Sequence, residues 1–239
     1  EAGMTKTIAV DNRSLPLIIR RTSRKRSIGV ELTCRHEVVV RAPRALGEKA
    51  IREGVDKCLP WLRKKLLLLP PAALSSLSSG GELLVLGEAR KLVVERGEGA
   101  ESRVVACDGE VRVILPGSRE MAPAAVRSAM VGWYQTQATE VIGELVARYS
   151  SVIGVSPPPF SITHARRRWG SCGANGRLNF AWRLAMAPLV CIEYVVVHEL
   201  CHLKRRDHSP AFWAMVAEIL PDYRERRRLL QQQGIRYDL

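Results

Sequence analysis

The most informative segment of the chain is LVCIEYVVVHELCHLK, residues 189–204. Pro188 stands just before it, where the first turn of a helix tolerates proline, and the segment is apolar on nearly every face of that helix. We therefore expect a buried helix. His198 and His202 lie four residues apart, so their side chains project from one face, one turn above the other. Two neutral imidazoles in this arrangement can occupy two corners of a tetrahedral zinc site.

Glu199 is the third polar residue at this end of the helix. It is too close to His198 in sequence to share the metal easily, but it can reach a metal-bound water and take its proton. An unpaired carboxylate among Val, Leu, Ile and Cys side chains would cost several kcal/mol, so a metal-site role accounts for three buried polar residues at once. The alternative is that the two histidines are only a packing detail. Cys201 points roughly 100° away from His202 and is expected in the core.

A third ligand requires the chain to reverse, because a straight helix cannot surround a metal ion. Residues 204–207 are a polar break, and His208 follows directly. Ser209 and Pro210 have the pattern of an N-cap and first helical position, which predicts a new helix over residues 211–220. His208 then lies at a corner that can fold back toward the other two histidines. Asp207 and Glu218 are alternative third ligands, and Glu218 could instead orient a histidine by hydrogen bonding.

The rest of the chain divides into short alternating segments and two long helical ones. Alternation predicts strands, hairpins and a strand–loop–strand unit, the second hairpin turning at Asp108-Gly109. These strands are expected at Leu15–Ile19, Ser27–Leu32, Val38–Val40, Leu83–Leu86, Leu92–Glu95, Val104–Cys107, Val111–Leu115, Phe160–Arg168 and Arg177–Leu184. Helical spacing predicts a helix over Glu48–Leu69 that Pro60 kinks or splits, and another over Ser118–Ser150 with Ser118 as N-cap. No internal repeat is evident, and Ser75–Gly81 is the best linker candidate.

Composition places the chain among ordinary globular proteins, with 46% hydrophobic and 26% charged residues. The net charge is +13 and is concentrated toward the two ends of the sequence, which favours polyanionic partners without naming one. The six cysteines are scattered without a Cys-x-x-Cys pair, no run of apolar residues could span a membrane, and no signal layout is seen. We therefore expect a cytoplasmic protein without disulfides.

The sequence resembles the YgjP-like metallopeptidases, a zincin-type family, over about residues 160–230. The matching segments are Arg168–Cys172, Leu178-Asn179, Trp182–Leu184, Ala187-Pro188, Tyr194–His202, His208–Trp213 and Pro221–Tyr223. The resemblance implies that His198, His202 and His208 are the ligands of one Zn²⁺ per chain and that Glu199 is the catalytic base. A fainter likeness links the chain to the SprT-like and Wss1-like proteases, which act on proteins crosslinked to DNA.

A zincin-like cleft binds peptide as an added strand on a sheet edge. The expected edge is Arg177–Arg183, with the Trp169–Gly173 loop near the cleft; alternatively, Trp169 fills the core. Peptide hydrolysis also needs a hydrogen-bond donor for the developing oxyanion. His164, Arg168, Tyr194 and Tyr223 are candidates, and the sequence does not choose among them.

Together these features predict an α+β fold in which a small sheet lies over a buried metal helix in a zincin-like C-terminal domain, preceded by a β-rich N-terminal region with a helix. The long helix would pack behind the metal helix. The expected boundaries are residues 4–75 for N-terminal strands plus helix, 76–117 for the β-hairpins and 118–239 for the metallopeptidase domain.

Three functions follow from this sequence. The first is a zinc-dependent endopeptidase that acts on peptide or protein substrates. The second is a protease of the SprT or Wss1 type, which binds nucleic acid through the arginine runs at residues 20–26, 166–168 and 226–228. Those runs are otherwise solvated faces. The third is a zinc-stabilised binding module without turnover.

Overall fold

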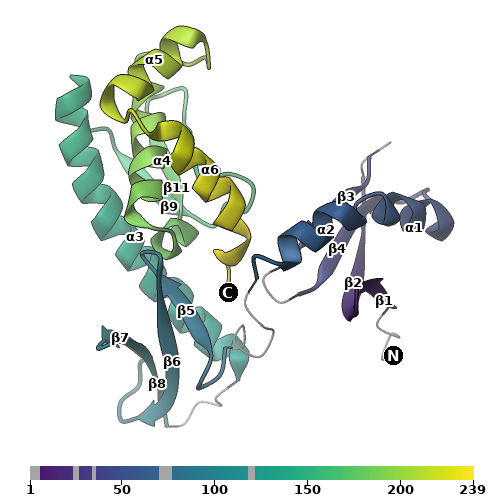
Figure 1. Cartoon of the computed structure of the whole chain (residues 1–239). Helices are drawn as coiled ribbons and strands as arrows, with labels where there is room; N and C mark the ends of the chain where they lie inside the picture. The colour runs from purple at the N-terminus through teal and green to yellow at the C-terminus, as the bar shows by residue number, and fades with distance from the viewer. Residues whose placement is uncertain (1–5, 24–26, 34–35, 70–76, 118–121) are drawn as a thin grey trace. The chain divides into compact units, whose positions relative to one another are not determined.

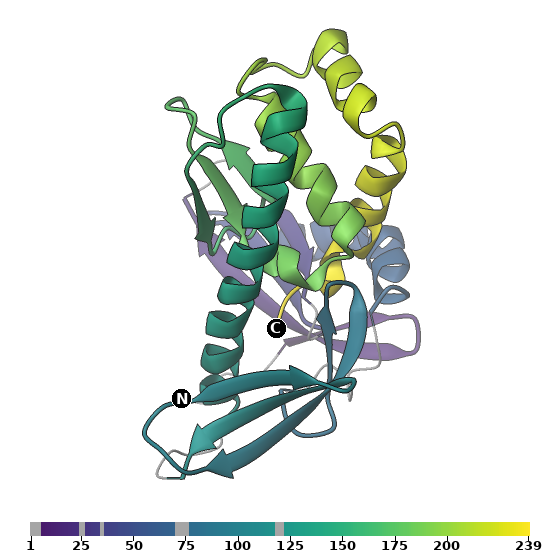
Figure 2. The ribbon, with the colours of Figure 1, turned by 90° about the vertical axis from the view of Figure 1, so that its left-hand side faces the viewer.

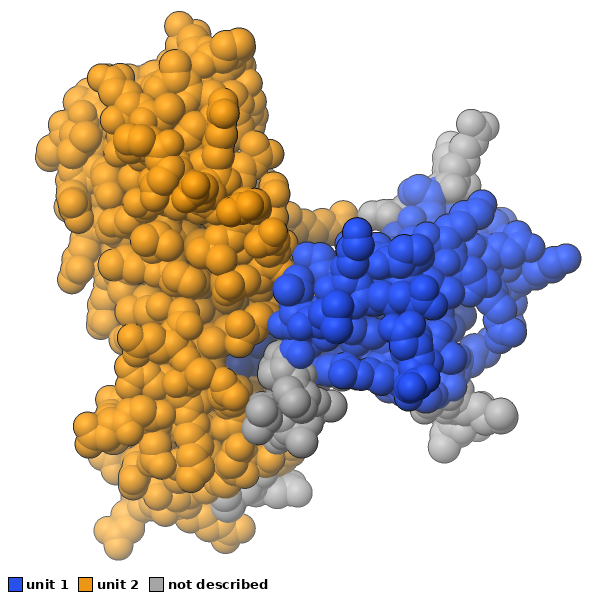
Figure 3. All heavy atoms as spheres, in the orientation of Figure 1, with its two compact units in different colours: residues 1–76, 238–239 blue, residues 77–237 orange. Residues whose placement is uncertain are grey.

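The computed structural model describes residues 6–23, 27–33, 36–69, 77–117 and 122–239 (Figure 1). The chain separates into two compact units, residues 1–76 with 238–239 and residues 77–237 (Figure 3). The three-part division expected from the sequence stays a prediction. Among the helices in the described ranges, none is both long and apolar enough to cross a membrane.

The first unit contains a four-stranded sheet of order β1-β2-β4-β3. β1 and β2 are antiparallel, β2 and β4 are parallel, and β3 and β4 are antiparallel. The strands are β1 (Lys6–Val10), β2 (Arg13–Thr22), β3 (Gly29–Leu32) and β4 (Val38–Pro43). Three of the four were predicted, and β1 was not. Arg35, in the expected turn between β3 and β4, lies outside the described residues.

The helical segment after this sheet is split, as Pro60 predicted. α1 (Glu48–Asp56) ends before α2 (Leu59–Leu66), and a proline stands in the first turn of α2, where its missing N–H is not needed. Ile51, Val55, Leu62 and Leu66 are buried at the expected helical spacing. The stop expected at Pro70-Pro71 and the first part of the Ser75–Gly81 linker lie outside the described residues.

The second unit begins with another four-stranded sheet, β5 (Glu82–Val85), β6 (Glu88–Gly97), β7 (Arg103–Cys107) and β8 (Glu110–Pro116). Its order, β5-β6-β8-β7, and its antiparallel–parallel–antiparallel pairing repeat those of the first sheet. The two sheets therefore share one topology, although no repeat is evident in the sequence. In each sheet, two hairpins pair with each other. Sequences that alternate apolar and polar residues can form this arrangement without being similar to one another.

The turns of this sheet are tight. Asp108-Gly109 forms the expected two-residue turn, with φ of 42° and 80°. The first hairpin turns at Leu86-Gly87, so the loop predicted over residues 87–90 is shorter and earlier than expected. The backbone N–H groups of Leu86 and Gly87 donate to the carbonyl oxygens of Ala185 and Met186 at 2.8 and 3.1 Å. This hairpin is therefore attached to the segment that leads into the metal helix.

The long helix α3 (Pro123–Ile153) connects the second sheet to the C-terminal elements (Figure 2). Its buried residues include Met130, Tyr134, Ala138, Ile142 and Leu145. The expected stripe included Trp133 and Val141, which are only half-buried, because the apolar face shifts along a helix of this length. The Tyr134 hydroxyl donates to the carbonyl oxygen of Leu84 at 2.7 Å.

The start of α3 also differs from the expectation. Ser118, the expected N-cap, lies outside the described residues, and the observed N-cap is Ala122. As expected, the helix packs against the metal helix α4 (Leu189–Cys201), and it also contacts the 3-10 helix η2 (Trp182–Met186). The long helix therefore forms one wall behind the metal helix.

A three-stranded sheet contains β9 (Phe160–Thr163), β10 (Gly170–Cys172) and β11 (Leu178–Ala181), and its strand β10 contacts α4. The order is β10-β11-β9, with β11 parallel to β9 and antiparallel to β10. The prediction that Arg177–Arg183 forms the open edge was wrong, because β11 is the central strand. The edge strand beside α4 is β10.

The chain ends with α5 (Pro210–Ile219), α6 (Tyr223–Gln233) and the short η3 (Gly234–Arg236). The metal helix lies between α3 and α6 in Figure 1 and contacts α3, α5, α6 and β10. Val195, Val196, Val197 and Leu200 are buried within this packing. The observed architecture is mixed α+β, as the sequence predicted.

Replacing Gly87 tests how strongly the β5–β6 turn supports the metal helix. Gly80 and Gly87 have nearly equal φ, 91° and 88°, but an added Cβ meets nothing within 4 Å at Gly80 and meets Pro188 at 2.8–3.0 Å at Gly87. We expect Gly87→Ala to lower the free energy of unfolding by about 1–3 kcal/mol more than Gly80→Ala does. Urea denaturation followed by fluorescence measures the difference. Equal effects would show that the contact with Pro188 contributes no stability.

Candidate metal centre

The chain reverses direction immediately after α4. His202 is the C-cap residue of that helix, and α5 starts eight residues later with Ser209 as its N-cap. The Ser209 hydroxyl accepts a hydrogen bond from the Phe212 N–H at 3.4 Å, and the Asp207 carboxylate accepts from the Ser209 N–H at 3.2 Å and from its hydroxyl at 2.7 Å. These local bonds define a tight corner, and His208 lies within it.

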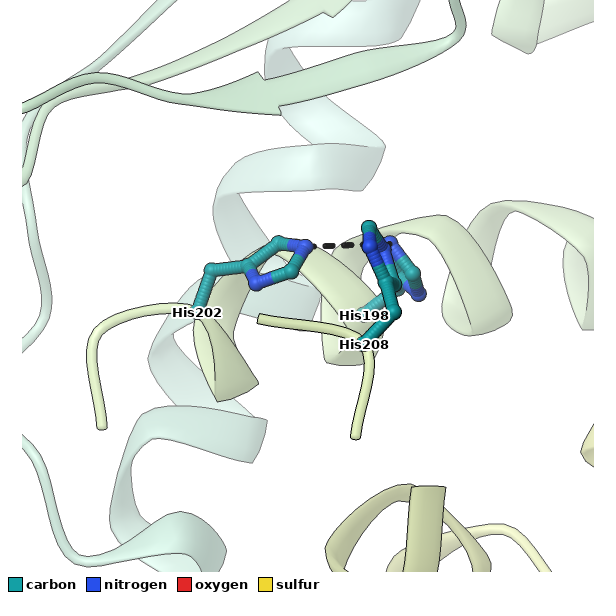
Figure 4. A group of neighbouring side chains, drawn as sticks. All are labelled: His198, His202 and His208. Atoms are coloured by element: carbon teal, nitrogen blue, oxygen red, sulfur yellow. Dashed lines mark hydrogen bonds between the residues drawn. The ribbon is translucent and has the colours of Figure 1, made fainter. Parts of the chain in front are cut away.

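The corner brings three imidazoles together (Figure 4). Nε2 of His198 lies 3.2 Å from Nε2 of His202 and 3.1 Å from Nε2 of His208. One ligand atom from each of the three histidines lies within 4.8 Å of the others. Two nitrogen ligands at about 2.05 Å from a tetrahedral zinc ion are about 3.3 Å apart. The spacing of the ring nitrogens therefore fits a single small divalent ion.

The protonation states of the histidines also suit metal binding. Nδ1–H of His202 donates to the carbonyl oxygen of Arg205 at 2.9 Å, which leaves a lone pair on Nε2, the atom nearest His198. Burial, together with the neighbouring His202 and His208, lowers the pKa of His198 to about 3. Burial is also the main cause of a lowered pKa at His202. Uncharged imidazoles are the form that binds a metal ion.

Two aromatic residues at the start of α5 hold the imidazole rings. Phe212 is fully buried and stacks on His202 with 4.5 Å between ring centroids, while Trp213 stacks on His208 at 5.6 Å. His198 contacts both aromatic rings, at 5.0 and 5.5 Å. The ring orientations are therefore set by apolar packing as well as by hydrogen bonds.

Glu199 lies beside the histidines and against the edge strand β10. Its side chain is 6% exposed, and burial raises the pKa of its carboxyl to about 7, against the lowering effects of a backbone hydrogen bond from Cys172 and of the Arg168 charge. The contact with β10 depends on a glycine, because a Cβ on Gly170 would lie 2.6 Å from Cγ and 2.7 Å from Oε1 of Glu199. Glycine at this position therefore lets the carboxylate lie against the strand.

An open cleft of about 470 Å³ gives access to these groups. It is lined by Arg168, Gly170, Ser171, Cys172, His198, Glu199, His202, Arg206 and His208. The three strand residues among them form all of β10. The cleft thus places the edge of a sheet, a buried carboxylate and three imidazoles that could bind a metal ion side by side.

The other candidate ligands do not join this group. Asp207 is bonded to Ser209, and Glu218 lines a separate cavity with Lys204 and Arg205. Within the described residues, the group that includes these imidazoles contains no carboxylate ligand. Both alternatives for the third ligand are therefore less suitable than His208. Cys201 is fully buried, in agreement with its expected place in the core.

Of the four candidates for an oxyanion donor, Arg168 lines the cleft. The His164 ring is hydrogen bonded to Gln135, and Tyr223 stacks on Trp213 at 5.3 Å. Tyr194 is buried with its ring 5.8 Å from that of His198, and burial raises its pKa to about 12. This geometry favours Arg168 for contact with a substrate.

The sequence left two alternatives for the segment from Trp169 to Gly173, a loop near the cleft or a tryptophan that fills the core, and the structure combines features of both. Trp169 packs against Tyr237 with 5.9 Å between ring centroids, and Arg183 lies over its ring at 5.5 Å. The following residues, Gly170–Cys172, line the cleft. The tryptophan therefore packs inside while the adjoining strand stays accessible.

Sequence reasoning missed Arg206 as a residue of the site. Its guanidinium donates to the carbonyl oxygens of Gly173 at 3.4 Å and Ala174 at 2.8 Å, so it joins the corner after α4 to the turn after β10. Its place two residues before His208 was the available signal. Only the fold shows which turn it reaches.

Several arginines of the expected nucleic-acid surface have structural partners. Arg21 donates to the carbonyl oxygens of Pro43 and Leu46. Arg226 pairs with Glu193 at 2.6 Å and Asp222 at 2.8 Å. Residues 24–26 lie outside the described residues. The nucleic-acid partner stays a prediction.

A family model described as the YgjP-like metallopeptidase domain matches residues 26–233 of this chain. The chain belongs to the YgjP-like family. It is a metallopeptidase by that membership, a hydrolase acting on peptide or protein substrates, and the three converging histidines of this YgjP-like chain could bind its metal ion. Among curated proteins, none matches the chain.

Removing the imidazole of His208 tests whether the corner supplies a ligand. We expect His208→Ala to weaken zinc binding by about 100-fold or more, because only the two histidines of α4 remain. Competition with a chromophoric chelator measures the affinity. His164→Ala removes an imidazole that lies outside the group and should bind zinc as wild type does. Equal affinity of the His208 variant and wild type would exclude His208 as a ligand.

Proposed function

We propose that the chain is a zinc-dependent peptidase with a zincin-like catalytic domain, in which His198, His202 and His208 hold one Zn²⁺ and Glu199 is the general base. The observation that carries this proposal is the convergence of three imidazoles beside a buried carboxylate in one cleft, with Nε2 of His198 3.1–3.2 Å from Nε2 of the other two. When bound, zinc supplies a Lewis acid that polarises the scissile carbonyl and lowers the pKa of water.

In this proposal Glu199 moves the proton. Its carboxylate follows His198 directly on α4 and lines the cleft, so it can accept a proton from the attacking water and pass it to the leaving amine. The hydrogen bond from the Cys172 backbone and the contact with Gly170 hold the carboxylate in one position. A carboxylate held in one position stays aligned with the attacking water, and misalignment of a catalytic group lowers the rate.

The edge of β10 is the proposed binding site for the peptide backbone. Within the described residues, β10 pairs with no strand other than β11, so its other side is open to a further strand apart from the Cys172 N–H, which bonds to Glu199. A peptide added there as a further strand would lie along the cleft that contains Glu199 and the histidines. Main-chain hydrogen bonds would then hold the scissile bond beside the catalytic groups.

Three expectations remain predictions from the sequence: a nucleic-acid-dependent protease, a zinc-stabilised module without turnover, and a cytoplasmic location. The first two differ from the proposed function in measurable ways. A nucleic-acid-dependent protease requires DNA or RNA for cleavage, and a binding module loses its fold on chelation but cleaves nothing.

Replacing the proposed base separates catalysis from metal binding. We expect Glu199→Gln to reduce kcat by about 10²–10⁴-fold while the chain keeps one zinc ion, because the amide cannot accept the proton. The assay is digestion of a proteome-derived peptide mixture, with zinc measured on the same samples. Glu218→Gln makes the same chemical change at an exposed position of α5 and should keep full activity. Undiminished cleavage by the Glu199 variant would overturn the proposal.

A second substitution tests the position of the carboxylate without changing it. Gly170→Ala places a methyl group against Glu199 and should lower kcat at least about tenfold, with a small change in zinc affinity. Gly132→Ala in α3 meets nothing within 4 Å and should leave kcat unchanged. Steady-state rates on one cleaved peptide give the comparison. If both variants are fully active, the close contact of strand and carboxylate is not needed for turnover.

A further inference from the structure

The cleft carries positive charge around its single carboxylate. Arg168 and Arg206 line it and are exposed, whereas Glu199 is buried and is the only acidic residue among the lining residues that the structure describes. The remaining lining residues are the histidines and the small side chains of β10. A substrate entering this cleft therefore meets two cations and no exposed anion.

The two arginines stand at opposite ends of the edge strand. Arg168 comes two residues before Gly170, the first residue of β10. Arg206 is held at the other end by its hydrogen bonds to the carbonyl oxygens of Gly173 and Ala174, which directly follow the strand. Any peptide that lies along β10 has one guanidinium near each of its ends.

The Arg168 end opens into a second, smaller cavity of about 240 Å³. Arg168, Gly170 and Ser171 line both cavities, so the two adjoin. The smaller cavity also contains Thr163 and Asn179 and no acidic residue among those that line it. The Thr163 hydroxyl donates to the carbonyl oxygen of Phe180 at 3.2 Å. The Arg168 guanidinium, the Asn179 amide and the Ser171 hydroxyl suit a carboxylate, which accepts hydrogen bonds from all three kinds of donor.

We propose that the cleft selects peptides bearing carboxylates on both sides of the scissile bond, with Arg168 and Arg206 as the specificity-determining residues. This inference rests on the proposed peptidase function and names its substrate class. The carboxylate is that of an Asp or Glu side chain or, on one side, the free carboxyl terminus of the peptide.

The spacing of the arginines sets where these carboxylates lie. Residues 168 to 174 are six steps along the chain, which spans at most about 20 Å in extended conformation. A substrate strand of about six residues covers the same length. With the scissile bond near the middle, the acidic groups are expected two or three residues from it on either side.

Paired peptides provide the experiment. The zinc-loaded full chain first digests a proteome-derived peptide mixture, with Glu199→Gln as the blank, and the sequences around each cleaved bond are read by mass spectrometry. One cleaved peptide is then synthesised with Glu, Gln or Lys at the flanking positions, and with a free or amidated carboxyl terminus. The rates are compared among wild type, Arg168→Gln, Arg206→Gln, Arg206→Lys and the control variants Arg167→Gln and Arg228→Gln.

The readout is the ratio of kcat/KM for the Glu peptide to that for the Gln peptide. We expect an acidic residue on either side of the scissile bond to raise this ratio about two- to fivefold at low salt, mainly through KM. The preference should shrink at high salt. Arg168→Gln and Arg206→Gln should each remove the preference on one side, Arg206→Lys should retain most of it, and the controls should keep it. If amidation of the peptide's carboxyl terminus abolishes the preference, the recognised carboxylate is that of the terminus. If the preference persists, the recognised carboxylates are those of side chains.

Two results would overturn the inference in distinguishable ways. Cleavage that depends on Glu199 but shows equal rates for Glu, Gln and Lys peptides rejects the carboxylate preference and leaves the peptidase function standing. Equal losses on all peptides in the two arginine variants also reject it, because a catalytic or merely structural role slows every substrate alike. If no peptide is cleaved although zinc is bound, the proposed function fails and the inference fails with it.

Discussion

The burial of Glu199 next to three imidazoles is the constraint on which the rest of this structure depends. A carboxylate that is only 6% exposed is costly unless its neighbours compensate for lost water. Compensation comes from a backbone hydrogen bond of Cys172, from the charge of Arg168 and from a glycine that lets the strand approach. The edge strand, the metal helix and the corner after it are therefore parts of one electrostatic arrangement.

The remainder of the second unit supports that arrangement from behind. α3 crosses from the four-stranded sheet to the metal helix, and its Tyr134 binds the Leu84 carbonyl while its ring lies 5.8 Å from that of Trp182. The turn of the same hairpin contacts Pro188 at the start of α4. The second sheet thus acts as a support for the metal helix, although it is far from the metal centre in sequence. The first unit has a sheet of the same topology, which α1 and α2 contact.

The groups proposed for catalysis and those proposed for selectivity occupy different parts of the cleft. Of the groups proposed for catalysis, those at the C-terminal end of α4 are buried or half-buried, whereas His208 at the corner is exposed. Packing by Phe212 and Trp213 fixes the orientation of the imidazole rings. The arginines are at the rim, exposed to solvent and close to where a peptide would extend beyond β10. Because the Arg168 charge also lowers the pKa of Glu199, a change of charge at this end of the rim acts on the proposed base as well as on the substrate.

Local patterns in the sequence were sufficient to predict the metal helix, the spacing of His198 and His202, the Ser209-Pro210 start of α5 and the Asp108-Gly109 turn. Each depends on helical periodicity or on bonds between residues a few positions apart, which the sequence determines directly. The convergence of His208 could be expected because the corner is only a few residues long. Tertiary structure alone decided that β10 and not β11 is the open edge, that α3 buries Tyr134 and not Trp133, that two sheets share one topology and that Arg206 reaches the turn after β10. These depend on which of several similar strands and faces pair with one another, and that choice is made by burying apolar surface across the whole chain.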